Sequence, residues 1–445
     1  MSRDNLDLRT NIRDRVWETA TRAEIADIQL EKLKETVQYC YNKVPYYRHK
    51  LDEAKVHPND IQTLQDIKRL PYTTKKDFHD TYPYGMFAVQ QNELLRIHAS
   101  SGTTGKPTVV GYTKNDMENW GELVARMATA AGVTDKDTVQ ISFGYGLFTG
   151  GFGLHYGLER IGAAIIPVSS GNTARQLMIL EDFGPTTLVS TPSYAAHLGE
   201  EAKKRDMKIG TDIKLNWGLF GSEPWTEGMR HRVETELGLN ATDNYGLSEI
   251  GGPGLSGECH TVRDGMHISE DMYFWEVIDP NTGEDVPEGA LGELVITPLW
   301  KEALPILRYR TRDLTSVVTS PCACGRTTAR MSRIHGRCDD MLIIRGVNVF
   351  PTQIEHILMQ SEYTSPHYLL VVKSEGVLDI LEVHIELNEQ FSAATVGQLS
   401  KIQEKLAKDI HSVLGLSVKV KLVEPYSLER SLGKAKRVRD ERNKD

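Results

Sequence analysis

The alternation of short apolar runs with helical segments in the first half of this chain most constrains its fold. Runs of β-branched and aliphatic residues predict buried strands at Val139–Phe143, Ala163–Val168 and Thr187–Ser190. Helical segments are expected at Arg175–Asp182 and Pro192–Lys204. This order is typical of an α/β domain with a largely parallel sheet.

The pattern changes twice toward the C-terminus. Residues 271–319 carry closely spaced strand signals and turns, which predict a β-rich part. The final stretch predicts a small α+β unit. Its expected strands are Leu369–Val372, Leu381–Ile385 and Val418–Leu422, and its expected helices are Gln353–Gln360 and Val396–Leu414. Together with a mainly helical start at about 7–50, the 445 residues fit two to three domains.

Charge and composition exclude several classes of function. The formal net charge is −9, which argues against general nucleic-acid binding. No apolar run reaches the length of a membrane span, and the N-terminal residues lack an apolar signal core. Five cysteines, an odd number without a secretion signal, argue against a disulfide framework. These features predict a cytoplasmic protein that binds neither nucleic acid nor membrane.

A run of hydroxyls, glycines and a lysine, Ser100–Thr108, predicts a phosphate-binding loop. Backbone N–H groups, hydroxyl donors and the Lys106 ammonium suit a polyphosphate. Only two residues separate Gly102 from Gly105, whereas a Walker loop needs four at that place. Pro107 also opposes the helix that follows a Walker loop. The loop is therefore of another kind, and a flexible linker is the alternative interpretation.

Two later segments offer groups for a nucleotide. Asp243–Glu249 combines Tyr245, which suits base stacking, with Glu249, which suits Mg²⁺ beside phosphate oxygens. A turn with a surface glutamate is the alternative there. Arg308–Leu314 places Asp313 after a strand, where its carboxylate can accept hydrogen bonds from ribose hydroxyls. The alternating charges of this segment equally indicate a solvated ion-pair ladder.

Two segments near the C-terminus have the composition expected of parts that move during a reaction. Gly336–Gly346 is a short polar linker between the large and the small unit, which fits a hinge or a static turn. In Gly433–Val438 a lysine follows a glycine, from where it can reach a phosphoryl or carboxylate oxygen. Charge runs usually face water, so a solvated basic tail is the alternative.

Flat aromatic side chains spaced by glycines follow the strand expected at Val139–Phe143. Tyr145, Gly146, Phe148 and Gly151 are expected on one loop, where they form a slot for a planar aryl ring. Ordinary core aromatics are the alternative interpretation.

These segments, in this order, resemble the adenylate-forming superfamily of acyl- and aryl-CoA ligases, and most closely its phenylacetate–CoA ligase family. The likeness extends over nearly the whole chain. The matching motifs are Ser100–Thr113, Tyr145–Gly151, Phe220–Trp225, Tyr245–Glu249, Gly336–Pro351 and Gly433–Ala435. One motif alone is a weak signal, and the common order of all of them gives the likeness its weight.

The resemblance implies a fold and a two-step reaction. The fold is α/β, with a large N-terminal adenylate-forming domain (1–338) that has parallel-sheet subdomains and a β-rich part. A small mobile α+β C-terminal domain (339–445) follows. In the reaction, a carboxylate displaces pyrophosphate from ATP, and the thiol of CoA then displaces AMP from the acyl-adenylate. Because AMP is the leaving group that a carboxylate lacks, positioning and charge stabilisation replace a covalent nucleophile.

The resemblance also implies roles for individual residues. Those for the phosphates are Ser101, Gly102, Thr103, Thr104 and Lys106. Those for the adenosine and its phosphate are Ser222, Glu223, Pro224, Asp243, Asn244, Tyr245, Gly246, Asp313 and Arg337. The implied catalytic set is Thr104, Glu249 as the Mg²⁺ ligand, and Lys434, which would bridge the carboxylate and the α-phosphate. Lys436 is the rival of Lys434, and Asp339 is the implied hinge.

Two positions depart from the family pattern. Ser222 stands where the family has alanine, and Arg312 stands where the superfamily usually has glycine before the ribose aspartate. A left-handed backbone at Arg312 would be costly because only glycine adopts it without strain.

Three cysteines and a histidine suit a structural zinc shell. Cys322 and Cys324 lie on an expected turn, and Cys259 lies upstream near His260 and His267. Three thiolates with one imidazole make a tetrahedral zinc site, and some members of the resembled family carry one here. His267 is preferred as the fourth ligand because His260 adjoins Cys259 and adjacent side chains diverge. Unligated reduced cysteines are the alternative.

The leading hypothesis is an ATP-dependent ligase that converts an aryl or arylalkyl acid, above all phenylacetate, to its CoA thioester. ATP, CoA and the acid are the implied small-molecule partners, with Mg²⁺ as cofactor, and benzoate-like acids remain open. A stand-alone adenylation module that loads a carrier protein is the second hypothesis. A non-catalytic nucleotide-binding relative is the third. A homodimer is a reasonable expectation from the resemblance alone.

Overall fold

The structure, a computed structural model, divides the chain into two compact units. The first comprises Met1–Ser190, Lys208–Ser222 and Gly238–Arg333, and the second comprises Thr191–Met207, Glu223–Leu237 and Ile334–Asp445. The described residues are 11–100, 107–338, 342–345, 347–375, 378–391, 394–430 and 436–442. Since the second unit takes two segments from the middle of the chain, the sequence boundary at 338/339 stays a prediction.

The first unit is built on a mixed sheet. Within the described residues its nine strands are β3 (Thr138–Ile141), β4 (Ala164–Ile166), β5 (Thr187–Ser190), β6 (Trp217–Gly221), β7 (Asn240–Leu247), β8 (Gly252–Glu258), β9 (Met266–Ile268), β13 (Val317–Val318) and β14 (Arg330–Met331). Their order is β13-β14-β9-β8-β7-β6-β5-β3-β4. The five strands from β7 to β4 run parallel, and the other four continue antiparallel. The predicted α/β fold is confirmed, and β3, β4 and β5, the strands expected from the sequence, all lie in the parallel part of this mixed sheet.

Burial follows position in this sheet. All four residues of β5 are buried, as expected of a central parallel strand that is covered on both faces. The prediction of a buried strand at Ala163–Val168 is wrong in its burial. Ala164 is exposed and Ile165 and Ile166 are half-buried, because β4 is the edge strand and pairs on one side only.

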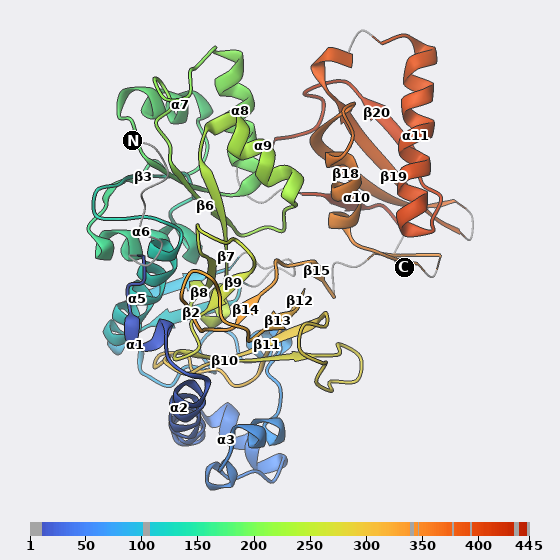
Figure 1. Cartoon of the computed structure of the whole chain (residues 1–445). Coiled ribbons are helices and arrows are strands. Elements are labelled where there is room, and N and C mark those ends of the chain that lie inside the picture. The colour runs from blue at the N-terminus through green and yellow to red at the C-terminus, as the bar shows by residue number, and fades with distance from the viewer. Residues whose placement is uncertain are drawn as a thin grey trace. The chain divides into compact units, whose positions relative to one another are not determined.

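Helices of the first unit lie beside this sheet (Figure 1). They are α1 (Arg15–Glu18), α2 (Arg22–Lys43), α3 (Pro45–Glu53), α4 (Lys75–Asp80), α5 (Lys114–Ala130), α6 (Thr149–Ile161) and α7 (Thr173–Asp182). α5 and α6 pack against each other and against β8. A Cβ atom at Gly157 would lie 2.3 Å from Cγ1 of Val124, so glycine permits this close approach. The helical start expected at 7–50 is divided, since Pro45 begins a new helix at α3.

Two smaller antiparallel arrangements complete the first unit. β10 (Tyr273–Ile278), β11 (Gly292–Pro298) and β12 (Tyr309–Thr315) pair in that order and form the predicted β-rich part. β1 (Arg96–Ala99) and β2 (Val109–Tyr112) form a hairpin.

The second unit contains α8 (Pro192–Lys204), α9 (Glu227–Leu237) and the C-terminal elements. These are β15 (Gly336–Arg337), β16 (Leu342–Ile344), β17 (Val347–Val349), α10 (Pro351–Met359), β18 (Thr364–Glu375), β19 (Leu378–Leu387), α11 (Val396–Leu414), β20 (Lys419–Val423) and β21 (Val438–Asp440). Four of the strands form a sheet in the order β20-β19-β18-β21, and α10 and α11 pack together on it (Figure 1). The predicted small α+β unit is confirmed. Among the described residues, no helix combines the length and hydropathy needed to cross a bilayer.

Candidate active site and metal-binding cluster

The expected phosphate loop connects the two strands of the β1–β2 hairpin. Ala99 pairs with Val109, and the backbone N–H of Ser100 donates to the carbonyl of Thr108 at 3.0 Å. The segment therefore leads from one strand to another, whereas a Walker loop leads from a strand to a helix. The expected phosphate ligands Ser101, Gly102, Thr103, Thr104 and Lys106 lie outside the described residues.

Glu249, the expected Mg²⁺ ligand, lies on a single turn of 3-10 helix, η5 (Ser248–Ile250), directly after β7. Its side chain is buried. The η5 turn packs against β2, the strand that leaves the phosphate loop. Ser248 Oγ lies 2.8 Å from Thr149 Oγ1, which ties the turn to the start of α6. The turn that carries the candidate metal ligand therefore packs against the strand that follows the phosphate loop.

Two expected nucleotide-binding residues contact each other directly. Tyr245 on β7 donates its hydroxyl to Oδ2 of Asp313 on β12 at 2.6 Å, and both side chains are buried. Asp313 lies within β12 and not after a strand, because the strand extends to Thr315. The fold thus brings together two residues 68 positions apart that the sequence connects only through the resemblance.

The arginines around Asp313 form ion pairs. Arg308 pairs with Glu276, and both Arg310 and Arg312 pair with Glu293. The ion-pair ladder is therefore present, although Arg308, Glu276 and Glu293 are buried and not solvated. The ribose-binding role of Asp313 stays a prediction.

Both positions that depart from the family pattern have a left-handed backbone. The φ angle is +72° at Ser222 and +66° at Arg312. Neither residue is glycine, so each position carries the strain that an L side chain meets in this region.

The other expected adenosine residues of the first unit lie on β7. The side-chain amide of Asn244 donates to the carbonyl of Phe220 at 2.6 Å, and the N–H of Asp243 donates to Glu258 at 2.8 Å. A Cβ atom at Gly246 would lie 2.0 Å from the carbonyl oxygen of Gly252, so this position requires glycine. These contacts fix the backbone of the motif.

The remaining expected nucleotide residues belong to the second unit or are not described. Glu223 accepts a hydrogen bond from the N–H of Ser193 at 2.7 Å, and Pro224 follows it. Arg337 lies on β15, and Lys436 is exposed. Asp339 and Lys434 lie outside the described residues.

The expected aryl slot is partly a loop and partly a helix. Tyr145, Gly146 and Phe148 precede α6, but Gly151 lies in its first turn, so its placement on the loop is wrong. Glycine is required at this position because a Cβ atom at Gly151 would lie 2.7 Å from the carbonyl oxygen of Gly144. Burial raises the pKa of the half-buried Tyr145 well above its ordinary value.

The four expected zinc ligands converge. The ligand atoms of Cys259, His267, Cys322 and Cys324 all lie within 4.8 Å of one another, and all four residues are buried. Cys259 Sγ lies 3.9 Å from Cys322 Sγ, and Cys324 Sγ lies 3.5 Å from His267 Nε2. The rival histidine, His260, points elsewhere and bonds through Nε2 to the Asn11 amide at 3.0 Å.

Residues around this Cys₃His cluster orient its members. His267 Nδ1 lies 3.2 Å from Thr328 Oγ1, which directs Nε2 toward Cys324. Arg326 donates to Cys324 Sγ at 3.6 Å and brings a positive charge to the thiols. Outer contacts of this kind fix ring orientation and ligand charge in metal sites.

Known proteins resemble this chain over nearly its full length. A family model described as AMP-binding enzyme matches residues 19–298, and one described as AMP-binding enzyme C-terminal domain matches 346–442. Phenylacetate-coenzyme A ligase of Escherichia coli is 48% identical over 426 residues, which cover 96% of this chain and 97% of that protein. The chain belongs to the phenylacetate–CoA ligase family of AMP-binding enzymes. The ligase of the same name from Thermus thermophilus is also 48% identical, with 95% and 98% of the two chains covered.

A solved ligase structure supports the assignment of this phenylacetate–CoA ligase family member to the adenylate-forming fold. 2-Hydroxyisobutyryl-CoA ligase in its postadenylation state, in complex with an acyl-AMP, has a TM-score of 0.92 at 29% identity, with 99% and 94% of the two chains covered. The same ligase with acyl-AMP and CoA in its thioesterification state has a TM-score of 0.71 at 31% identity, with 96% and 91% covered. As a family member, the chain is an AMP-forming ligase.

The sequence did not predict that Lys301 of this family member is a buried cation. Lys301 donates to the carbonyl of Gly111 at 2.9 Å, lies 3.6 Å from the ring centroid of Tyr112 and lies 3.7 Å from Asp116. Burial lowers its pKa to about 8, although Asp116 opposes the shift. A lone lysine after β11 carries no local signal of this environment.

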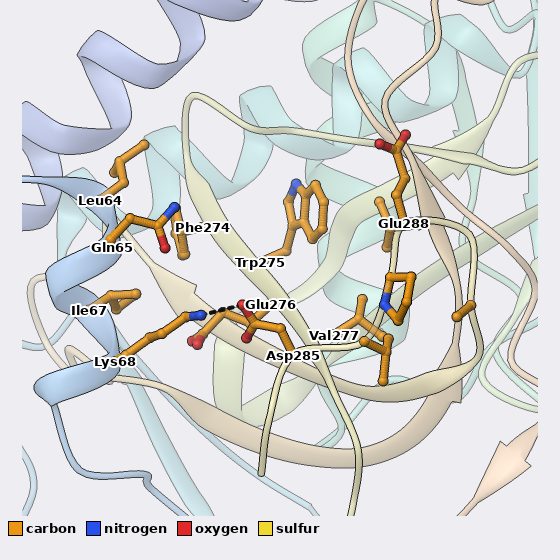
Figure 2. A pocket seen from close by; sticks show the side chains of 14 residues that line it. Leu64, Gln65, Ile67, Lys68, Phe274, Trp275, Glu276, Val277, Asp285 and Glu288 are labelled. Carbon is orange, nitrogen blue, oxygen red and sulfur yellow. Dashed lines mark ion pairs between the residues drawn. The ribbon is translucent and has the colours of Figure 1, made fainter.

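A cavity of about 160 Å³ in the first unit contains none of the expected site residues. Figure 2 shows it between a 3-10 helix, η3 (Leu64–Arg69), and β10. Phe274, Trp275 and Val277 line it, and the exposed ion pair of Lys68 and Asp285 lies at its rim. The cavity therefore shares no residue with the nucleotide motifs.

Proposed function

We propose that this chain converts phenylacetate, ATP and CoA to phenylacetyl-CoA, AMP and pyrophosphate. The contact between Tyr245 Oη and Asp313 Oδ2 carries the proposal at the site, because it joins the base-stacking and ribose-binding candidates. The 48% identity to proteins named phenylacetate-coenzyme A ligase supports the substrate. A relative named benzoate–CoA ligase, from Thauera aromatica, is only 24% identical over 281 residues.

In the first step a carboxylate oxygen of phenylacetate attacks the α-phosphorus and pyrophosphate leaves. Thr104 and the other hydroxyls of the phosphate loop hold the β- and γ-phosphates, and Lys434 bridges the carboxylate and the α-phosphate. These residues lower the barrier by positioning and by compensating negative charge. In the second step the CoA sulfur attacks the acyl carbon and AMP leaves. Rotation about Asp339 would withdraw Lys434 between the two steps.

Mg²⁺ fits the donors at η5. Glu249 offers a buried carboxylate there, and hard oxygen donors of this type suit Mg²⁺. When bound, Mg²⁺ neutralises charge on the phosphate oxygens. Glu249 would hold it next to the strand that leaves the phosphate loop.

Zn²⁺ fits the Cys₃His cluster, where it would be structural. A tetrahedral shell with Zn–S bonds of about 2.3 Å places two sulfurs about 3.8 Å apart, and a sulfur and an imidazole nitrogen about 3.6 Å apart. The corresponding distances here are 3.9 Å and 3.5 Å. Four protein ligands leave no open position, so Zn²⁺ would fix the turn at Cys322–Cys324 and take no part in the reaction.

The proposal extends to the acceptor, the location and the assembly. The names of the relatives favour CoA over a carrier protein. Consumption of ATP and CoA, together with five free cysteines, favours the cytoplasm. A homodimer rests on the family resemblance, and light scattering during size-exclusion chromatography tests it.

Pyrophosphate release and thioester formation, measured with a panel of acids, test the proposed function. Phenylacetate is expected to give both with CoA present, at a higher kcat/KM than benzoate or hexanoate. Pyrophosphate release without a CoA thioester would favour the carrier-protein hypothesis. Absence of acid-dependent pyrophosphate release would leave only nucleotide binding.

A further inference from the structure

His98 stands at the junction of two functional segments in the first unit. It lies on β1, three residues before Ser101 in the phosphate loop, and is 2% exposed. Its Nδ1 lies 3.0 Å from the carbonyl oxygen of Leu147, on the loop of the expected aryl slot. The next residue, Ala99, donates its N–H to the same oxygen at 2.8 Å. We call the loop of the expected aryl slot, Tyr145–Phe148, the acid loop. Two consecutive residues of β1, the strand that enters the phosphate loop, therefore hold one backbone carbonyl of the acid loop.

The direction of the His98 bond follows from its partner. A carbonyl oxygen only accepts, so Nδ1 carries the proton and donates. Burial lowers the pKa of His98, against the effect of the Leu147 bond, so the ring stays neutral near pH 7. Nε2 is buried without a hydrogen-bond partner among the described residues, and the ring is thus anchored on its Nδ1 side.

Aromatic rings continue this connection toward the expected slot. The His98 ring lies edge-on to Tyr112 at 5.8 Å and tilted against Phe152 at 5.7 Å. Phe152 in turn meets Tyr145, a slot residue, at 5.1 Å. Leu147 itself is 65% exposed, so its side chain does little to hold the loop. Backbone bonds from β1 and the ring contacts of His98 hold it instead.

We propose that His98 is a positioning residue for the aryl acid. It holds the acid loop at Leu147 in a fixed place relative to the phosphate loop, so that the carboxylate meets the α-phosphate. The proposal rests on the proposed function and deepens it. It assigns His98 no contact with ATP, so loss of the Nδ1 donor should weaken use of the acid more than use of ATP.

Two nearly isosteric variants separate this role from general support of the fold. His98→Asn places an amide N–H where Nδ1 was and keeps the donor to Leu147. His98→Gln places its amide near the position of Nε2 and removes that donor. Ile97→Ala is the control, because Ile97 is the preceding residue of β1 and is 41% exposed.

Acid-dependent pyrophosphate release gives the KM for phenylacetate, the KM for ATP and kcat for each variant. His98→Gln is expected to raise the KM for phenylacetate at least tenfold, which equals about 1.4 kcal/mol, with the KM for ATP within twofold of wild type. His98→Asn should stay within threefold for both, and Ile97→Ala within twofold. The preference for phenylacetate over hexanoate should fall in His98→Gln and remain in His98→Asn.

Three outcomes would overturn the proposal while wild type remains active. Equal effects of the Asn and Gln variants would show that the Nδ1 donor is irrelevant. A parallel rise in both KM values would indicate general damage to the hairpin. A fall in kcat alone, equal for all acids, would indicate loss of folded protein. An inactive wild type would instead refute the proposed function.

Discussion

The hydroxyl of Tyr245 donates a 2.6 Å hydrogen bond to the carboxylate of Asp313, and both side chains are buried. This bond joins β7 of the large sheet to β12 of the β-rich part. It also fixes the carboxylate that we propose binds the ribose.

Tyr245→Phe removes this bond and keeps the ring. A hydrogen bond to a charged group contributes about 1.5–3 kcal/mol, so a less fixed Asp313 should raise the KM for ATP about tenfold. The KM for phenylacetate serves as the internal control and should change less than threefold. Steady-state kinetics of pyrophosphate release provide both values, and an unchanged KM for ATP would contradict the role of the bond.

Lys434→Ala should abolish formation of the adenylate and spare thioester formation from supplied phenylacetyl-adenylate. The lysine is proposed to compensate charge only while the carboxylate attacks the α-phosphate. Lys436→Ala is the matched control, because Lys436 lies two residues away and is exposed. Half-reaction assays separate the two steps. Loss of both steps in Lys434→Ala, or a larger defect in Lys436→Ala, would refute the assignment.

His267→Ala and His260→Ala should differ in zinc content. The purified protein is expected to hold about one zinc per chain by elemental analysis, since four ligands converge at the Cys₃His cluster. His267→Ala should lose the metal and lower the melting temperature, whereas His260→Ala should keep it. Metal-free wild type, or loss of zinc in both variants, would contradict the proposed shell.

Stability at alkaline pH should depend on Lys301. Its pKa is lowered from 10.5 in its ordinary state to about 8 in the fold, so between these values the unfolded chain binds a proton that the native protein has released. The free energy of unfolding therefore gains from this group as pH rises across that window, by up to about 3 kcal/mol. Lys301→Met should lack this gain when urea unfolding is compared at pH 7 and pH 10. If the free energy of unfolding changed equally with pH in the two proteins, the pKa of Lys301 would not be lowered in the fold.

Substitutions of Arg312 test whether its left-handed backbone conformation is strained. Within an ordinary strand, alanine is more stable than glycine, but at a φ of +66° the order should reverse. Arg312→Gly is expected to exceed Arg312→Ala in free energy of unfolding by about 1 kcal/mol. Both variants lose the same ion pair with Glu293, so the comparison isolates the backbone. Greater stability of the alanine variant in urea denaturation would contradict the strain.

Local signals predicted most of the elements. The bounds of α8 and α11 agree with the structure because their ends carry strong local chemistry: Pro192 follows the Thr191 cap, and Gly415 ends α11 in a left-handed conformation. The edge position of β4 escaped prediction, since an apolar run does not reveal which strand lacks a neighbour. The helical start expected at 7–50 was not predicted to be divided, although a proline such as Pro45 favours the first position of a new helix.

Contacts between distant segments of the chain limited how much of the site could be predicted from the sequence. The grouping of Cys259 and His267 with the Cys322–Cys324 turn was accessible from ligand chemistry. The bonds from His98 to Leu147 and from Tyr245 to Asp313 were not, because each joins segments that only the assembled sheets bring together. Gly151 was misplaced because no capping side chain marks the start of α6: Phe148 at the N-cap makes no side-chain cap hydrogen bond.

Transfer of oxygen from the acid to AMP tests the central claim most directly. In a single turnover with ATP, CoA and phenylacetate labelled with ¹⁸O in both carboxylate oxygens, attack on the α-phosphorus leaves one labelled oxygen in AMP after the thiol displaces it. Mass spectrometry should therefore find one ¹⁸O per AMP together with unlabelled pyrophosphate. Unlabelled AMP, or label in a phosphate product, would contradict an acyl-adenylate intermediate.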